Sequence, residues 1–510
     1  MSLIFFENLT HSNGGKKLYN NATMRINKGE HIALLGANGT GKTSLLNLIV
    51  NKTIPDVGEI EVQPRIKIGY LDQHHDINQE QTVEEYLKDT FSDLYEMQDK
   101  ITKIYESMAL EYKEEEYIKA LEYQEYLDMK GFDLIEKNIG NFISGLGIEQ
   151  ENYTKKLKQL SGGQIGKILL AKLLLSNSDV LLLDEPTNFL DIEQVEWLMK
   201  FLQNYENAFL IVSHDNDFIN NTVNIIYAIE NQQINRYVGN YEKYIELSNL
   251  RKEQYDKSVE SQQNQIQKLQ TYVDKNKARA STAKSAQSRQ KKLDKMTILK
   301  ERTELAKPNF KFKYKRPATS ITIKLENLEI GYDFALTKPL NFELREGEKG
   351  IVSGYNGIGK TTFLNTITGN LQPISGKVEI GNGVIIAYFK QTEISDDLTP
   401  IEFLMRKFPN MAEQQIRQTI AKFGVKNDLM LNKMNLLSGG EQTKVRLAAL
   451  SLESCSLLIL DEPTNHIDVL AKESLLEAIE LFEGTVLLTT HDINFQTNWA
   501  NKIINFETLV

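Results

Sequence analysis

The pattern G-x-x-x-x-G-K-T occurs twice in the sequence, as GANGTGKT at residues 36–43 and as GYNGIGKT at residues 354–361. Each copy follows an apolar stretch and opens a helix-like run, which is the context that a phosphate-binding loop requires. Its glycines let backbone N–H groups turn toward phosphate oxygens, and the dipole of the following helix favours negative charge. The residues expected at the β- and γ-phosphates are Lys42 and Lys360, and those expected to hold Mg²⁺ are Thr43 and Thr361.

An apolar stretch that ends in two acids also occurs twice, as VLLLDE at residues 180–185 and as LLILDE at residues 457–462. Such runs are typical of buried parallel strands, and an acid at the carboxyl end of the strand lies beside the phosphate loop. We expect the aspartates to bind Mg²⁺ and the glutamates to orient or deprotonate an attacking water. These residues are Asp184 and Asp461, followed by Glu185 and Glu462.

Further landmarks recur in the same order, so the chain consists of two homologous units. Gln391 follows Gln73 by 318 residues, the same offset as the phosphate loops. The Leu-Ser-Gly-Gly stretches at 160–163 and 437–440, the two acid pairs, and His214 and His491 share an offset of 277. Each histidine follows an apolar strand, and we expect it near the γ-phosphate.

The change of offset from 318 to 277 places a 41-residue insertion in the first unit, within residues 78–158. Apolar residues near helical spacing predict helices with an added helical arm. The 19 acidic and 10 basic residues of this segment argue against phosphate binding along its length. A solvated helical hairpin and a protein-docking arm both remain open.

A linker follows from residue 241 to residue 316. Residues 241–274 contain no Gly or Pro, which predicts a long helix. Residues 276–287 are small and polar and suggest a tip, and residues 289–305 resume a helical composition, so two antiparallel helices are expected. Residues 268–316 contain 16 Lys and Arg against 4 Asp and Glu.

The composition of the whole chain limits its class. Its 510 residues are 41% hydrophobic and 25% charged, as in ordinary globular proteins. The net charge of −10 argues, as an average, against a nucleic-acid partner, but the basic linker contradicts it. Cys455 is the single cysteine, which excludes an intramolecular disulfide and a thiolate metal cluster. No apolar run approaches the roughly 18 residues of a membrane span, and Glu7 comes too early for a signal peptide, so we expect a cytoplasmic protein.

The landmarks together resemble the ATP-binding-cassette (ABC) superfamily, with its phosphate loop, glutamine loop, Leu-Ser-Gly-Gly signature, acid-ended strand and switch histidine. The resemblance implies an α/β fold of two ABC-type nucleotide-binding domains, each a RecA-like core plus antiparallel β and helical subdomains. A long α-helical hairpin linker would join them. The expected boundaries are 1–240, 241–316 and 317–510. The implied activity is ATP hydrolysis, with ATP and Mg²⁺ as cofactors.

The resemblance also implies two composite sites, in which the phosphate loop of one domain faces the signature of the other. One site would combine Lys42, Thr43, Gln73, Asp184, Glu185 and His214 with Ser438 and Gly440. The other would combine Lys360, Thr361, Gln391, Asp461, Glu462 and His491 with Ser161 and Gly163. The resemblance implies that the glutamates and histidines are catalytic. It implies that Mg²⁺ is bound by Thr43, Gln73, Asp184, Thr361, Gln391 and Asp461. Further nucleotide contacts are implied for Gly36, Asn38, Gly39, Gly41, Ser44, Gly354, Asn356, Gly357, Gly359, Thr362 and Tyr332.

Two departures distinguish the first domain. Tyr332 fits the aromatic residue that stacks on adenine in this superfamily, whereas the matching residues 10–14 offer only His11. After the first signature the chain reads IGKIL at 165–169, where the second reads QTKVR at 442–446. The two sites are therefore expected to differ in rate.

Within the superfamily, the twin cassettes, the arm and the basic linker resemble the ABC-F proteins, and residues 276–295 look typical of that family. The resemblance implies binding to the ribosome, with the linker reaching rRNA and P-site tRNA through residues 268–316. It also implies a monomer that pairs its own cassettes. A housekeeping translation factor and an antibiotic-resistance ribosome-protection factor share this layout. From other classes, the soluble ATPase subunit of a membrane transporter and a DNA-repair ATPase are alternatives.

Overall fold

The computed structural model of the chain describes residues 2–37, 39–71, 78–109, 113–188, 190–276, 283–296, 307–355, 357–390, 397–464, 467–490, 495 and 499–509. The predicted site residues that lie outside the described residues are Asn38, Gln73, Asn356, Gln391 and His491.

The first repeat is built around a six-stranded sheet with the strand order β5-β6-β7-β3-β8-β9. Neighbouring strands are parallel except for the antiparallel pair β8 and β9. Leu181 and Leu183 of β6 pack with the helices on one face, and Leu182 packs with β1, β2 and α1 on the other. The strands are β3 (His31–Leu35), β5 (Ile68–Tyr70), β6 (Val180–Asp184), β7 (Ala208–Val212), β8 (Ile225–Glu230) and β9 (Gln233–Val238).

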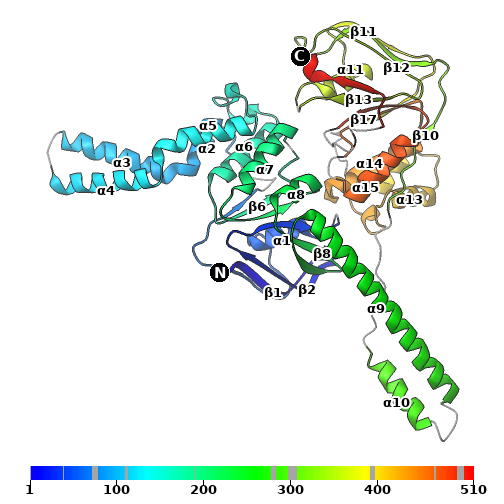
Figure 1. The fold of residues 1–510 in the computed structure, drawn as a ribbon. Helices are drawn as coiled ribbons and strands as arrows, with labels where there is room; N and C mark the ends of the chain where they lie inside the picture. The colour runs from blue at the N-terminus through cyan, green and yellow to red at the C-terminus, as the bar shows by residue number, and fades with distance from the viewer. Residues whose placement is uncertain are drawn as a thin grey trace.

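A separate antiparallel sheet and eight described helices complete the first repeat. The sheet has the order β2-β1-β4, with β1 (Ser2–Asn13), β2 (Lys16–Asn27) and β4 (Ile60–Val62). The helices are α1 (Lys42–Ile49), α2 (Val83–Lys88), α3 (Ser92–Met108), α4 (Glu114–Met129), α5 (Ile135–Gly145), α6 (Gly162–Leu175), α7 (Ile192–Gln203) and α8 (Asn216–Thr222). Helices α3 and α4 form the predicted arm and protrude from the repeat (Figure 1).

The second repeat follows the same plan. Its main sheet has the order β15-β17-β18-β13-β19, and all its described pairs are parallel. The strands are β13 (Lys349–Ser353), β15 (Ile386–Phe389), β17 (Leu457–Asp461), β18 (Thr485–Thr489) and β19 (Lys502–Asn505). The smaller sheets comprise β12 (Leu340–Arg345), β11 (Ile321–Glu329) and β14 (Ser375–Ile380), and the pair β10 (Lys313–Tyr314) and β16 (Ser454–Cys455). The helices are α11 (Lys360–Ile367), α12 (Pro400–Lys407), α13 (Glu413–Lys422), α14 (Gly439–Leu452) and α15 (Val469–Glu480). The predicted α/β fold class is confirmed.

The linker extends away from both repeats (Figure 1). It contains α9 (Tyr241–Asn276) and α10 (Ala283–Asp294), which lie side by side. The prediction that residues 276–287 form a non-helical tip was wrong from residue 283 onward, since α10 begins there. Alanine is the best helix former, and the Ala and Ser residues of this stretch are compatible with a helix. The second predicted helix, 289–305, is helical to Asp294, and residues 297–306 lie outside the described residues.

None of the helices in the described part of the chain is both long and apolar enough to cross a bilayer.

Candidate nucleotide-binding sites

In both repeats, a phosphate loop joins a central strand to a helix. Helix α1 begins at Lys42 directly after Gly41, whose φ is 102°, and α11 begins at Lys360 directly after Gly359, whose φ is 109°. A Cβ atom on Gly41 would lie 2.5 Å from the Tyr19 hydroxyl oxygen, so this position excludes a side chain sterically as well as conformationally. The loop thereby directs the N–H groups of the helix start toward one point, as an anion site requires.

Both loop lysines are folded back over their loops. Lys42 Nζ donates to the Gly36 carbonyl at 2.8 Å, and Lys360 Nζ donates to the Gly354 carbonyl at 2.6 Å. Burial lowers the pKa of both amino groups, and neighbouring carboxylates oppose that shift. A bound phosphate supplies the negative charge that favours the ammonium form, so the lysines fit the predicted role.

The threonine after each lysine meets the aspartate at the end of β6 or β17, which is separated by one strand from the strand that leads into the phosphate loop. Thr43 Oγ1 donates to Asp184 Oδ2 at 2.7 Å, and Thr361 Oγ1 donates to Asp461 Oδ2 at 2.9 Å. Hydroxyl and carboxylate oxygens are suitable donors for Mg²⁺, which takes few protein ligands and completes its shell with phosphate and water. Among the described residues, no three His, Cys, Asp or Glu side chains gather into a metal cluster.

The glutamate after each aspartate sits in a strained backbone conformation. Glu185 and Glu462 both have a φ of 49°, and their N–H groups donate to the Val212 and Thr489 carbonyls of the next strand. For residues other than glycine, this left-handed region is uncommon and is found at functional sites. The turn redirects the chain at the carboxyl edge of the sheet, where the phosphate loop also lies.

The first glutamate also contacts the predicted switch histidine. The His214 N–H donates to Glu185 Oε2 at 3.3 Å, and His214 Nε2 lies 3.5 Å from Glu185 Oε1. Burial and then the charge of Asp184 raise the pKa of Glu185 to about 7. A carboxylate with such a pKa is suited to accept a proton near neutral pH. The corresponding histidine, His491, lies outside the described residues.

The Leu-Ser-Gly-Gly stretches begin two helices, and both starts carry capping boxes. The Gln164 N–H donates to Ser161 Oγ at 3.3 Å, and the Glu441 N–H donates to Ser438 Oγ at 3.4 Å. In turn, the Ser161 N–H donates to Gln164 Oε1 and the Ser438 N–H donates to Glu441 Oε2. These boxes fix the helix starts at Gly162 and Gly439.

The second signature lies against the first phosphate loop. A Cβ atom on Gly39 would be 3.5 Å from Glu441 Oε1, which places α14 beside this loop. The charge of Asp468, also from the second repeat, raises the pKa of Lys42 against the larger effect of burial. Asp191 of the first repeat acts in the same way on Lys360. The charge of an acid from the opposite repeat thus acts on the lysine of each phosphate loop.

These two aspartates are functional candidates that the sequence reasoning missed. Asp468 accepts the Ala471 N–H at the start of α15, and Lys444 Nζ lies 2.5 Å from its Oδ2. In the first repeat, Lys167 Nζ lies 3.9 Å from Asp191 Oδ2. Each pair ties a signature helix to the acid that faces the opposite site. The signal was present, because both pairs recur at the offset of 277.

The two candidates for base stacking, Tyr332 and His11, differ in exposure. Tyr332 is exposed, at 67% of its surface, and its ring is free of the core. His11 lies in β1 opposite Tyr19 with only 8% of its surface exposed, so its ring faces are covered. The remaining predicted contacts, Gly36, Ser44, Gly163, Gly354, Gly357, Thr362 and Gly440, lie in the phosphate loops, in α1 and α11, or at the starts of α6 and α14.

Comparison with known proteins gives a consistent result along the whole chain. A family model described as ABC transporter matches residues 19–188 and 337–465, and an extension model of the same description matches residues 227–312. The chain is 40% identical to the ABC transporter ATP-binding protein YfmM of Bacillus subtilis, over 100% of this chain and 99% of that protein. It is 31% identical to ABC transporter F family member 5 of Arabidopsis thaliana, over 98% of this chain and 74% of that protein.

Solved structures share the twin-repeat fold. A model of ribosome-bound archaeal Pelota and ABCE1 matches with a TM-score of 0.60 at 19% identity, covering 98% of this chain and 76% of the matched chain. The structure of RNase-L Inhibitor matches with a TM-score of 0.59 at 18% identity, covering 98% of this chain and 87% of that one. At these identities the likeness concerns the fold alone.

Proposed function

The chain belongs to the ABC-F family of twin-cassette ATP-binding-cassette ATPases, and from this premise we propose that it acts on the ribosome to modulate translation. Its linker enters from the E site toward P-site tRNA and the peptidyl-transferase centre, and ATP hydrolysis releases the factor. The observation that carries the proposal is the linker itself. It bears 16 Lys and Arg against 4 Asp and Glu at residues 268–316, on a chain whose net charge is −10.

The described part of the linker presents its cations to solvent. The exposed lysines near its free end include Lys268 and Lys275 of α9 and Lys291, Lys292 and Lys295 in or directly after α10. A hairpin of this charge on an acidic body is attracted into an RNA-lined cavity while the rest of the chain is repelled. Phosphate contacts of this kind need no base readout, which suits recognition of a structured RNA by shape.

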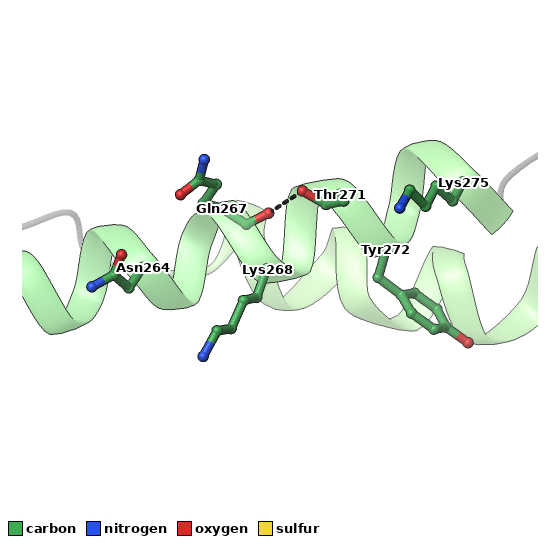
Figure 2. A pocket seen from close by; sticks show the side chains of 6 residues that line it. All are labelled: Asn264, Gln267, Lys268, Thr271, Tyr272 and Lys275. Carbon is green, nitrogen blue, oxygen red and sulfur yellow. Dashed lines mark hydrogen bonds between the residues drawn. The ribbon is translucent and has the colours of Figure 1, made fainter.

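A groove of about 390 Å³ follows α9 near the free end of the linker. It is lined by Asn264, Gln267, Lys268, Thr271, Tyr272 and Lys275. Figure 2 shows these side chains on successive turns of α9, and it marks the bond of 2.7 Å by which Thr271 Oγ1 donates to the Gln267 carbonyl. Amide, hydroxyl and ammonium groups beside one aromatic ring are the mixture that binds phosphate, ribose and exposed bases.

The two cassettes determine how long the factor stays on the ribosome. We infer that each of two ATP molecules lies between a phosphate loop and the opposite signature, so that ATP draws the cassettes together. The contact between Gly39 and Glu441 supports this arrangement for the first site. Closure fixes the position of the linker on the ribosome, and hydrolysis reopens the pair. Closure and release, rather than the chemical step, then set the residence time.

The residues of each cassette divide the chemistry between them. Lys42 and Lys360 bind and neutralise phosphate oxygens, and the helix starts add N–H donors. Thr43 with Asp184, and Thr361 with Asp461, would hold Mg²⁺, which supplies charge neutralisation at the β- and γ-phosphates when it is bound. Glu185 and Glu462 orient and deprotonate the attacking water. Glu185 accepts the His214 N–H, and the His214 ring would contact the γ-phosphate.

Co-sedimentation with ribosomes tests the proposal. The double variant Glu185→Gln and Glu462→Gln retains the phosphate-binding groups and lacks both bases, so it should pellet with ribosomes in ATP and stay in the supernatant without nucleotide. The unmodified chain, which hydrolyses ATP and dissociates, is the matched control. A trapped variant that stays off ribosomes and binds membrane vesicles instead would mean that the transporter alternative is correct.

Within the family we propose the housekeeping type of translation factor, because the first repeat retains the arm formed by α3 and α4. Expression of the chain in a sensitive host should leave the tolerated dose of drugs that target the peptidyl-transferase region unchanged. A raised dose would identify the antibiotic-resistance type instead.

A further inference from the structure

Two helices begin at the first nucleotide site, one from each repeat. Helix α8 follows His214 almost directly, and Asp215 caps it by accepting a backbone N–H of its first turn at 3.0 Å. Helix α15 is capped in the same way by Asp468, which accepts a backbone N–H at 2.9 Å. Although burial opposes the shift, Lys444 and also the charge of His214 lower the pKa of Asp468. The starts of α8 and α15 therefore face each other where the two repeats meet (Figure 1).

The linker leaves the first repeat beside the far end of α8. Asn220 Nδ2 donates to Glu242 Oε1 at 3.3 Å, and the Glu242 N–H donates to Asn220 Oδ1 at 3.2 Å. Glu242 lies in the first turn of α9, so this reciprocal pair ties α8 to the beginning of the linker. A movement of α8 is therefore carried into α9.

The linker returns to the second repeat on α15. Lys307 Nζ donates to Glu477 Oε1 at 2.7 Å and lies 3.9 Å from Glu473 Oε2, and the two acids are one turn apart on α15. Burial and then the charge of Glu473 raise the pKa of Tyr241, the first residue of α9. One face of α15 thus lies beside both ends of the linker.

Helix α7, the equivalent of α15 in the first repeat, begins at the second site and has a different surface. By the offset of 277, Glu196 and Lys200 of α7 correspond to Glu473 and Glu477 of α15. An ammonium group at this position would repel Lys307 instead of binding it. The acid that binds the returning linker therefore belongs to the helix of the first site alone.

The repeats also approach each other more closely at the first phosphate loop. A Cβ atom on Gly39 would lie 3.5 Å from Glu441 of the opposite repeat. The equivalent loop residue of the second site is Gly357, and no described atom lies within 4 Å of a Cβ atom there. Movement at the first site is thus transmitted directly between the repeats.

We propose that the first nucleotide site, rather than the second, sets the orientation of the linker, and that Glu473 and Glu477 are the positioning residues through which α15 transmits it. When ATP draws the loop of Lys42 toward the second signature, the starts of α8 and α15 move together, and the linker ends bound to these helices follow. The second site acts on α7, which carries Lys200 in place of Glu477. This inference rests on the proposed closure of the cassettes on ATP and is independent of the ribosomal partner.

Spin labels on the full chain test the inference without a ribosome. One label is attached at Lys275→Cys, near the free end of α9, and the other at Leu481→Cys, directly after α15. Both positions are exposed, and the native Cys455 is buried and stays unlabelled. Glu185→Gln and Glu462→Gln prevent hydrolysis. ATP should then shift the distance between the labels, as measured by pulsed electron paramagnetic resonance.

Silencing one site at a time identifies the site that moves the linker. Lys360→Ala removes the phosphate-binding lysine of the second site and should keep most of the shift, whereas Lys42→Ala should abolish it. Equal responses of the two silenced chains, or loss in Lys360→Ala alone, would overturn the inference and leave the proposed closure standing. If ATP causes no shift even in the chain with both lysines intact, the proposed closure is wrong, and this inference is wrong with it.

Variants of the ion pair test the positioning residues. Lys307→Glu brings three acids together and should reduce the ATP-dependent shift, and Lys307→Glu combined with Glu477→Lys should restore it. Lys407→Glu is the matched control, because Lys407 Nζ lies 2.7 Å from Glu453 Oε1 in another partly exposed ion pair, at the end of α12. This control should keep the full shift, and all these chains should bind ATP equally well. Failure of the exchanged pair to restore the shift, or an equal loss in Lys407→Glu, would mean that Glu477 does not position the linker.

Discussion

Cys455 lies in β16 with 1% of its surface exposed, and burial, followed by the charge of Glu453, raises the pKa of its thiol to about 12. A thiol reacts as the thiolate, so at pH 8 the native chain should leave a thiol reagent almost unconsumed. Unfolding in guanidinium should release one reactive thiol per chain. The measurement is a thiol titration with and without denaturant, and rapid labelling of the native chain would show that β16 opens readily.

Lys444 and Asp468 form the tighter of the two pairs that join a signature helix to the opposite site. The distances are 2.5 Å for this pair and 3.9 Å for Lys167 and Asp191. Removal of one member of a buried pair leaves a buried charge and costs about 3–5 kcal/mol. We therefore expect Lys444→Met to lower the free energy of unfolding by about 3 kcal/mol, and Lys167→Met to lower it by less, in denaturant titrations.

Because Asp468 titrates, the loss of unfolding free energy in Lys444→Met should depend on pH. Burial acts to raise the pKa of Asp468, but Lys444 and the Ala471 N–H hold it below its usual range. An acid with a lowered pKa stabilises the fold above its unfolded pKa, about 4, and this stability is lost as the pH falls through the folded value. The deficit of Lys444→Met should thus persist from pH 8 to pH 5 and shrink below pH 4. A deficit that is unchanged at pH 3 would assign the effect to lost packing.

At the scale of elements, Tyr272 of α9 contacts two side chains of α10. The Arg289 guanidinium carbon lies 3.5 Å from the centre of the Tyr272 ring, and the Tyr272 hydroxyl lies 3.4 Å from Ser285 Oγ. A cation over a ring contributes about 0.5–2 kcal/mol. Tyr272→Ala should therefore speed amide exchange in α10 by about 2- to 30-fold, as measured by hydrogen–deuterium exchange.

The variant Tyr272→Phe distinguishes the contribution of the ring from that of the hydroxyl group. Tyr272→Phe removes the bond to Ser285 and keeps the ring under Arg289, so exchange in α10 should stay close to that of the unmodified chain. If both variants exchange equally fast, the hydroxyl bond and not the ring holds the helices together.

Elements with a strong local signal were predictable from the residues themselves, whereas contacts between distant elements were expected only from the family resemblance. The absence of Gly and Pro predicted α9, and apolar runs ending in Asp184 and Asp461 predicted β6 and β17. The start of α10 at Ala283 was missed because small polar residues suit both a tip and a helix. The contact of Gly39 with Glu441 joins residues far apart in the chain, so no periodicity reveals it.

At the scale of the whole molecule, the charges are unevenly distributed along the chain. The net charge is −10, whereas residues 268–316 carry 16 bases against 4 acids. The arm shows the opposite balance within residues 78–158, with 19 acids and 10 bases. If the linker contacts RNA, binding releases counterions from the phosphates, and affinity falls steeply as salt rises.

Two variants with the same net charge test whether ribosome binding depends on the position of the positive charges or on the net charge of the chain. Lys291→Gln, Lys292→Gln and Lys295→Gln remove three exposed linker cations, and Lys100→Gln, Lys103→Gln and Lys119→Gln remove three from the acidic arm. In ATP, with both glutamates replaced, the linker variant should bind ribosomes more weakly and with a salt slope shallower by about 2 to 3. The arm variant should keep the full slope, because its lysines do not meet phosphate. Equal slopes for the two variants would mean that the overall field, and not the linker, attracts the ribosome.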